Sequence, residues 1–168
     1  ERMYPLDREP GEGWTPARYT DGRPAAGVLS TNGMWFRYET SGANQNRKRA
    51  NQISRILLCD DYLDSPVPAS ASTDLLDEDA LEDALRTDPA CRSCHDTLDP
   101  LASFLYGFWP VLEGSDEVAR YHPERELLWQ ETGVAPSYYG QGGETLADLG
   151  RHLAADPRFL DCMAQRTT

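Results

Sequence analysis

The chain has 168 residues, 28 acidic and 16 basic side chains and a formal net charge of −12, which argues against nucleic acid as a partner. An apolar content of 39% suits one domain with a core, whereas 13 glycines and 12 prolines indicate many turns and several short helices. The sequence has no run of about 18 apolar residues, so it predicts no membrane-spanning segment.

The first part of the chain predicts an arm followed by two helical segments. Residues 1–25 contain too many prolines and glycines for a regular element, so we expect an extended arm there. Residues 25–38 predict a short helix that breaks at Gly33. Residues 44–59 place apolar side chains at helical spacing and predict a helix with one buried face, capped by Asn44.

The middle of the chain predicts a linker and two separate helices. Residues 60–73 contain prolines, serines and alanines and are typical of an extended linker. A helix is expected from Thr73 to about Thr87, with acidic residues in its first turn, where the helix dipole favours them. A second, very apolar helix is expected to begin at Asp99-Pro100 and to reach Trp109.

The last part of the chain predicts loops and then two helices. Residues 110–143 are rich in glycine and proline and predict loops, with at most one hairpin that pairs Glu117–Tyr121 with Glu126–Gln130. Thr145–Ala155 has leucines at helical spacing, and a final helix is expected to start at Pro157.

The strongest chemical signal is the pentapeptide Cys91-Arg92-Ser93-Cys94-His95. Two thiols one helical turn apart can add to the two vinyl groups of haem, and a histidine directly after them can ligate the iron. The motif therefore predicts one c-type haem. Cys91 and Cys94 would carry the thioether bonds, and His95 would be the proximal ligand. The apolar helix after the motif would wall the haem off from water.

Three alternatives for the cysteine pair are a disulfide, a zinc site and a redox-active dithiol. Zinc would need further ligands, for which only Cys59, Cys162, His122 and His152 remain, none at a spacing typical of zinc ribbons. A redox dithiol would follow a strand, whereas the preceding segment is helical and acidic. Haem remains the favoured interpretation.

The distal iron ligand has four candidates, which are Met34, Met163, His122 and His152. We favour Met34, because Met34-Trp35-Phe36 is the most apolar run away from the motif. A methionine ligand would set a higher reduction potential than a histidine ligand. The alternative is an open distal position.

Several segments resemble a known family. Gly27-Val28-Leu29-Ser30, Leu57-Leu58-Cys59, Asp88 to His95, Leu98-Asp99-Pro100-Leu101, and Leu146 through Asp156-Pro157 to Cys162 occur in this order. Over about residues 26–166 the chain resembles the C-terminal haem-motif region of the large, uncharacterised multi-domain cytochrome c proteins of planctomycetes and myxobacteria. It departs from their usual pattern at Thr40–Asn44 and at Ala102–Trp109, so the lining of the haem pocket differs.

The resemblance implies a haem protein outside the cytoplasm and a cysteine at positions 59 and 162. Haem attachment leaves these two cysteines, and an oxidising compartment favours their pairing, so we expect a disulfide between Cys59 and Cys162. The first residues lack the apolar core of a secretory signal, which favours a processed chain or a fragment.

Together these features predict a mostly α, loop-rich mono-haem c-type cytochrome. Residues 1–25 would form the arm, 26–143 the haem-binding domain, and 144–168 a helical segment packed on it. The expected function is electron transfer in a larger redox assembly, to a redox partner protein or other cytochrome subunits, with no catalytic residues. The expected place is the periplasm or another extracytoplasmic compartment, with membrane association only through a partner. The alternative is a haem enzyme of peroxidase type with an open distal iron site.

Overall fold

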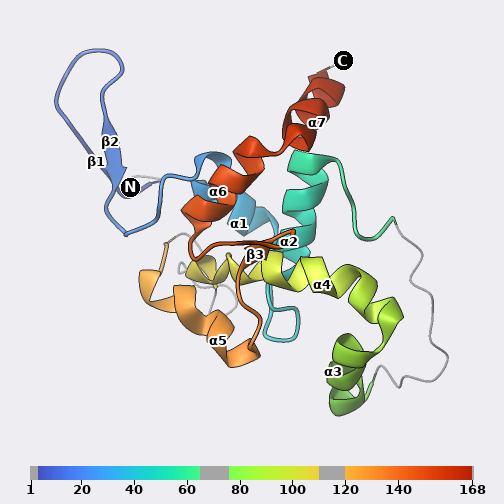
Figure 1. Ribbon diagram of the computed structural model, residues 1–168. Coiled ribbons are helices and arrows are strands. Elements are labelled where there is room, and N and C mark those ends of the chain that lie inside the picture. The colour runs from blue at the N-terminus through green and yellow to red at the C-terminus, as the bar shows by residue number, and fades with distance from the viewer. Residues whose placement is uncertain (1–3, 65–75, 110–119, 168) are drawn as a thin grey trace.

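The protein is mostly helical, as a computed structural model shows (Figure 1). The structure describes residues 4–64, 76–109 and 120–167. Within these ranges it contains seven α-helices and two small antiparallel sheets of two strands each. The predicted mostly α fold class is therefore confirmed.

The elements follow in chain order. The α-helices are α1 (Asn32–Arg37), α2 (Arg47–Ile53), α3 (Glu78–Thr87), α4 (Pro89–Ser103), α5 (Trp129–Thr132), α6 (Leu146–Ala155) and α7 (Pro157–Thr167). The shorter helical turns are η1 (Gly27–Ser30), the π-helical η2 (Ser54–Leu58), η3 (Tyr106–Phe108) and η5 (Pro123–Leu128). The strands are β1 (Leu6–Arg8), β2 (Ala17–Tyr19), β3 (Ser137–Tyr138) and β4 (Gln141–Gly142).

The N-terminal arm contains a β-hairpin, so the prediction that it has no regular element is wrong. Strands β1 and β2 pair antiparallel, with Leu6 opposite Tyr19, and the hairpin projects from the body in Figure 1. The strands themselves hold no proline, because Pro10 and Pro16 lie in the connection between them. Buried Arg23 joins the arm to the body by donating to Asp21 and to the Ser30 carbonyl.

The helices of residues 25–59 begin later than predicted. Gly33 lies inside α1 and does not break it, since an isolated glycine costs a helix only about 1 kcal/mol. Helix α2 starts at Arg47 because Asn46 adopts a left-handed conformation, with φ of 64°. Asn44 still supplies a cap bond, since its side-chain oxygen accepts from the Lys48 amide at 2.9 Å.

Helix α3 begins at Glu78, where Asp77 caps it by accepting from the amides of Asp79 and Ala80. The predicted start at Thr73 and most of the predicted linker lie outside the described residues. The first helical residue therefore follows the nearest side chain that can cap the helix.

One continuous helix, α4, replaces the predicted break between the cysteine motif and Asp99. Its first residue is Pro89, and Asp88 caps it through the Ala90 amide at 2.8 Å. Pro100 lies inside the helix, although it lacks the N–H of a normal helical residue. The helix tolerates it because α4 packs against α2, α3 and β3, and buries Leu98 and Leu101.

The predicted hairpin of residues 117–130 is wrong. Residues 126–130, the expected second strand, belong to η5 and α5. Residues 117–119 of the expected first strand lie outside the described residues. Pro123 explains the difference, because proline suits the first turn of a helix and cannot donate to a strand ladder. A shorter hairpin forms later, where β3 pairs with β4 around the positive φ angles of Tyr139 and Gly140.

The core gathers side chains from both halves of the chain. Trp35 of α1 stacks on Phe108 of η3, with ring centroids 4.6 Å apart. Fully buried Arg49 donates to the carbonyls of Tyr38 and Phe108, both at 2.8 Å. Burial lowers the pKa of Arg49 to about 10, although Glu39 opposes the shift, so the guanidinium stays charged at neutral pH.

The two C-terminal helices form as predicted, and α6 starts with a capping box. The Asp148 carboxylate accepts from the Thr145 amide at 2.8 Å and from the Glu144 amide at 3.0 Å. These backbone hydrogen bonds lower the pKa of Asp148 to about 2. The cap therefore depends on an ionised carboxylate.

Replacing Asp148 with alanine is expected to lower the free energy of unfolding by about 1 kcal/mol at pH 7. Because the folded-state pKa lies below the ordinary 3.8, this contribution is complete above that value and is lost as pH falls through about 2. Urea denaturation between pH 7 and pH 2 measures the difference. Asp161→Ala, an exposed site on α7, serves as the control. A difference from the wild type that stays constant down to pH 2 would contradict the assignment.

Candidate functional site

The cysteine motif occupies the first turns of α4. Cys91 and Cys94 are three residues apart on a helix, so their side chains leave the same face, about 4.5 Å apart along the axis. Both thiols are free and partly exposed. Between them, the Ser93 hydroxyl donates to the Ala90 carbonyl at 2.6 Å and also lies 3.9 Å from Sγ of Cys94. The helix therefore presents two free thiols on one face.

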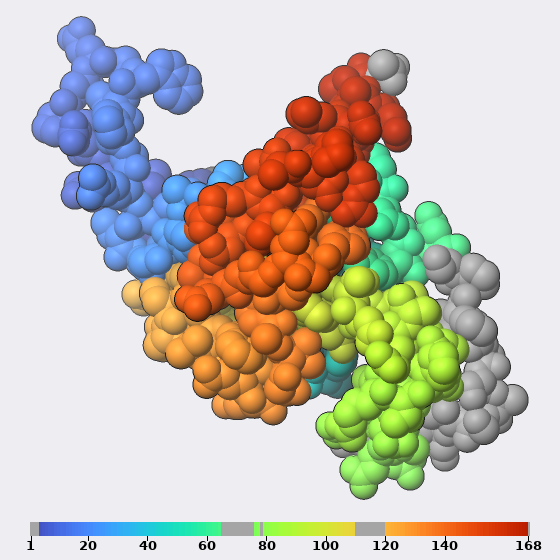
Figure 2. All heavy atoms as spheres, viewed as in Figure 1, coloured from blue at the N-terminus to red at the C-terminus, as the bar shows by residue number. Residues whose placement is uncertain are grey.

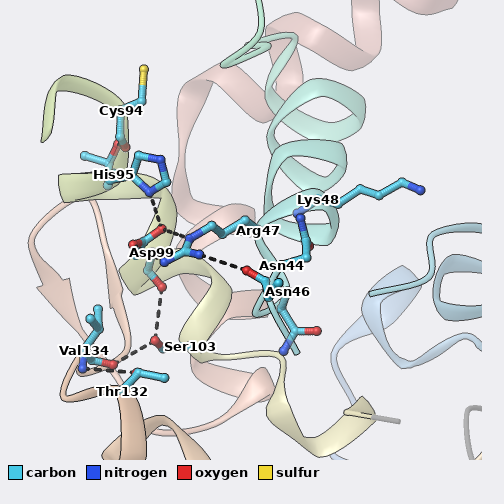
Figure 3. A network of polar contacts seen from close by, with 12 residues as sticks. Asn44, Asn46, Arg47, Lys48, Cys94, His95, Asp99, Ser103, Thr132 and Val134 are labelled. Atoms are coloured by element: carbon cyan, nitrogen blue, oxygen red, sulfur yellow. Dashed lines mark hydrogen bonds and ion pairs between the residues drawn. The ribbon is translucent and has the colours of Figure 1, made fainter. Parts of the chain in front are cut away.

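His95 follows the second thiol and has one of its two ring nitrogens engaged. Its Nδ1 lies 2.9 Å from Oδ1 of Asp99, one helical turn further along α4 (Figure 3). An ionised carboxylate can only accept, so Nδ1 carries the proton. Within the described chain, the hydrogen bond of the His95 ring is the one from Nδ1 to Asp99, and no hydrogen bond involves Nε2. Its lone pair is therefore free to bind a metal.

Asp99 also pairs with an arginine of another helix. Nε of Arg47 on α2 lies 2.8 Å from Oδ1 of Asp99, and a terminal nitrogen of Arg47 lies 3.0 Å from Oδ2. Figure 3 shows the carboxylate between the imidazole and the guanidinium. Burial raises the pKa of Asp99, but hydrogen bonds from His95 and Arg47 outweigh it and hold the pKa below its usual value. The carboxylate is ionised.

Asp99 and Arg47 are not among the site residues that the sequence predicts. The expected start of a new helix at Asp99 hides the relation of this residue to His95. The signal was present, because residues four apart on one helix are neighbours. Arg47 gave no such signal, since 52 residues separate it from Asp99.

Two further contacts hold α4 in place. The Tyr62 hydroxyl lies 3.0 Å from the Thr97 hydroxyl, and it connects α4 to the segment after η2. At the C-terminal end of the helix, the Ser103 hydroxyl lies 2.8 Å from the Val134 carbonyl (Figure 3). The helix that carries the motif is therefore held at its middle and at its C-terminal end.

The surface around the motif is acidic. Asp79, Glu82 and Asp83 are exposed on α3, which packs against α4. Figure 2 shows α3 as a lobe that projects from the body, with a hollow between this lobe and α5. The motif thus lies beside a negatively charged projection.

Two distal candidates, Met34 and Met163, lie in apolar surroundings. Met34 on α1 is a buried member of the main core, and Met163 on α7 is partly buried against it. Neither residue lies on α4, the helix that carries the motif.

The two histidine candidates are each held by other groups. His122 has Nδ1 2.9 Å from Glu124, while its buried Nε2 has no hydrogen-bond partner in the described chain. His152 on α6 stacks on Tyr138, and its Nε2 lies 3.1 Å from the Gly142 carbonyl. The distal ligand, Met34 included, stays a prediction.

The donor set fits haem better than it fits zinc. Cys59 and Cys162 are joined in a disulfide and cannot serve as thiolate ligands. Among the described residues, no three or more histidine, cysteine, aspartate or glutamate side chains form a cluster that could hold a metal ion. The pair Cys91 and Cys94 is not a disulfide either. Two free thiols and one free imidazole nitrogen on a single helix are the set that c-type haem requires.

The disulfide between Cys59 and Cys162 forms as expected, with Cα atoms 5.3 Å apart. Cys59 ends η2 in a left-handed conformation, and Cys162 is buried on α7. Helix α7 also packs along η2. The bond thus fixes the C-terminal helix to the middle of the chain.

An apolar pocket of about 340 Å³ lies elsewhere in the molecule. It is bounded by η1, α6 and α7 and is lined mainly by small side chains such as Ala26, Ala147 and Ala154. None of Cys91, Cys94 and His95 lines it. The pocket is therefore separate from the motif.

Comparisons with known proteins returned no match: neither a protein-family model, nor a curated protein, nor a solved structure is similar to the chain. Among the helices of residues 4–64, 76–109 and 120–167, none has the length and apolar character needed to cross a membrane. The function must therefore be argued from the geometry of the site.

Proposed function

We propose that this protein is a mono-haem c-type cytochrome domain that transfers electrons. Cys91 and Cys94 hold one haem covalently, and His95 ligates its iron. The observation that carries the proposal is the arrangement on α4, where two free thiols one turn apart precede an imidazole with a free Nε2. A bound haem supplies one-electron exchange between ferric and ferrous iron.

The rest of the chain positions the residues that would hold this group. Asp99 holds the imidazole ring in one orientation, and the Arg47–Asp99 pair ties α4 to α2. Leu98 and Leu101, further along α4, are buried in the main core and anchor the helix that carries the motif. These features support a redox centre held in a fixed position.

The disulfide supports an extracytoplasmic location, because such bonds persist in oxidising compartments. This location agrees with the resemblance to the multi-domain cytochrome c proteins of planctomycetes and myxobacteria, and we propose that the chain is related to them. In that setting the chain acts within a larger redox assembly. A cytochrome subunit or another redox protein then accepts the electron.

The acidic lobe of α3 should favour positively charged redox partners. We expect the reduced protein to react faster with hexaammineruthenium(III) as ionic strength falls, and more slowly with ferricyanide. Stopped-flow absorption of the haem measures both rates. Asp79→Asn together with Asp83→Asn should weaken the salt dependence, because both side chains are exposed on α3 beside the motif.

Asp161→Asn, at an exposed position of α7, is the matched single-charge control for Asp83→Asn alone and should change the salt dependence less. Equal effects of the α3 and α7 variants would show that α3 does not face the electron-transfer path.

The ferric spectrum tests the central proposal: a low-spin, six-coordinate haem supports a carrier. A high-spin haem that consumes peroxide at enzyme-like rates would replace the carrier with the peroxidase-type enzyme.

A further inference from the structure

We propose that Asp99 and Arg47 act as positioning residues that set the reduction potential of the haem on His95. Asp99 lowers the potential, and Arg47 limits how far it falls. This inference rests on the proposed function, since it concerns the same iron site. It adds two residues and a direction of effect that the cysteine motif does not contain.

The first step is the orientation of the imidazole. His95 and Asp99 lie four residues apart on α4, and the hydrogen bond from Nδ1 to Oδ1 is 2.9 Å long. It fixes the tautomer with Nδ1 protonated and also fixes the ring rotation, so that Nε2 is always the free nitrogen. A histidine held this way needs no rearrangement to ligate iron.

The second step is the electronic effect of the carboxylate. A carboxylate that accepts the Nδ1 proton makes the imidazole a stronger electron donor at Nε2. Stronger donation stabilises ferric iron more than ferrous iron, which lowers the reduction potential. Asp99 therefore favours the oxidised haem.

The third step concerns shielding from water. The side chains of His95, Asp99 and Arg47 are 25%, 16% and 20% exposed. The nearby pair of Arg92 and Asp96 on the same helix is 51% and 56% exposed. Water screens the exposed pair more strongly, so the shielded triad has the larger effect on the iron.

The fourth step is the part played by Arg47. Arg47 donates two hydrogen bonds to the oxygens of the Asp99 carboxylate. These bonds draw on the negative charge of the carboxylate, which is then less available to the hydrogen bond from His95. Oδ1 of Asp99 is shared between Nδ1 of His95 and Nε of Arg47. The guanidinium thus weakens the pull of the carboxylate on the imidazole proton. Its removal should strengthen that pull.

The helix itself provides the matched control. Arg92, within the motif, and Asp96, directly after it, form an ion pair four residues apart on α4, and neither side chain forms a hydrogen bond with His95. Asp96→Asn removes the same charge as Asp99→Asn, and Arg92→Gln removes the same charge as Arg47→Gln. A purely coulombic effect of charge near the haem appears in both pairs of variants.

The experiment compares the midpoint potentials of these four variants and the wild type by spectroelectrochemical titration. Asp99→Asn should shift the ferric-to-ferrous equilibrium at least tenfold toward ferrous haem, which is 59 mV upward for a one-electron couple. Arg47→Gln should shift it in the opposite direction. Asp96→Asn and Arg92→Gln should each shift it less than threefold. Equal shifts at positions 96 and 99 would overturn the inference.

Two further measurements separate this inference from the proposed function. Intact mass shows whether each variant carries haem, and a wild type without haem refutes the proposed function itself. Variants that all carry haem with unchanged potentials refute only the tuning by Asp99 and Arg47. If Asp99→Asn does not fold, Arg47→Gln and Arg47→Lys decide the question. Lysine keeps the charge without the paired hydrogen bonds, so its potential should lie between the wild type and Arg47→Gln.

Discussion

Replacing Cys91 and Cys94 together with serine is expected to abolish covalent haem attachment. When the protein is produced with a cytochrome c maturation system, the wild type should gain the mass of one haem after denaturation. The double variant should show the bare polypeptide mass, because serine hydroxyls do not add to the vinyl groups as thiols do. Intact-mass spectrometry and the absorption of the denatured protein measure the loss.

Ser93→Ala is the matched control, because Ser93 lies between the two cysteines and points to the Ala90 carbonyl. This variant should carry haem as the wild type does. Single replacement of Cys91 or Cys94 should leave one thioether bond at most. A wild type with the bare polypeptide mass under these conditions would refute the cytochrome proposal.

Replacing Cys59 and Cys162 together with alanine is expected to lower the free energy of unfolding by about 4 kcal/mol. The residues are 103 positions apart, and the chain-entropy model gives roughly this value for closing a loop of about 100 residues. Such a loss is a large part of the total stability of a small domain, which is about 5–15 kcal/mol. Urea denaturation followed by circular dichroism measures it.

A reductant separates the effect of the bond from that of the side chains. It should destabilise the wild type and leave the alanine variant unchanged. Thiol alkylation without reduction, followed by peptide mapping, should label neither Cys59 nor Cys162. Labelling of either residue in the folded, non-reduced protein would contradict the disulfide.

Local sequence signals predicted most of the helices, with errors where two signals competed. Thr145 and Pro157 marked the starts of the last two helices correctly, because caps and prolines act within one turn. Asp99-Pro100 predicts the start of a helix, but packing of α4 against its neighbours keeps the helix continuous through Pro100. The same proline rule applied at Pro123 would have predicted the helical turn that replaced the hairpin.

The sequence by itself determined the chemistry of the protein, since the thiols and imidazole of Cys91 to His95 lie within five residues and one helix brings them together. Only the tertiary structure decided what surrounds them. Arg47 meets Asp99 because α2 packs on α4, and this contact between residues 52 positions apart depends on the packing of the two helices. Local pattern thus fixes which groups would hold the proposed haem, whereas packing sets the charges and shielding around them.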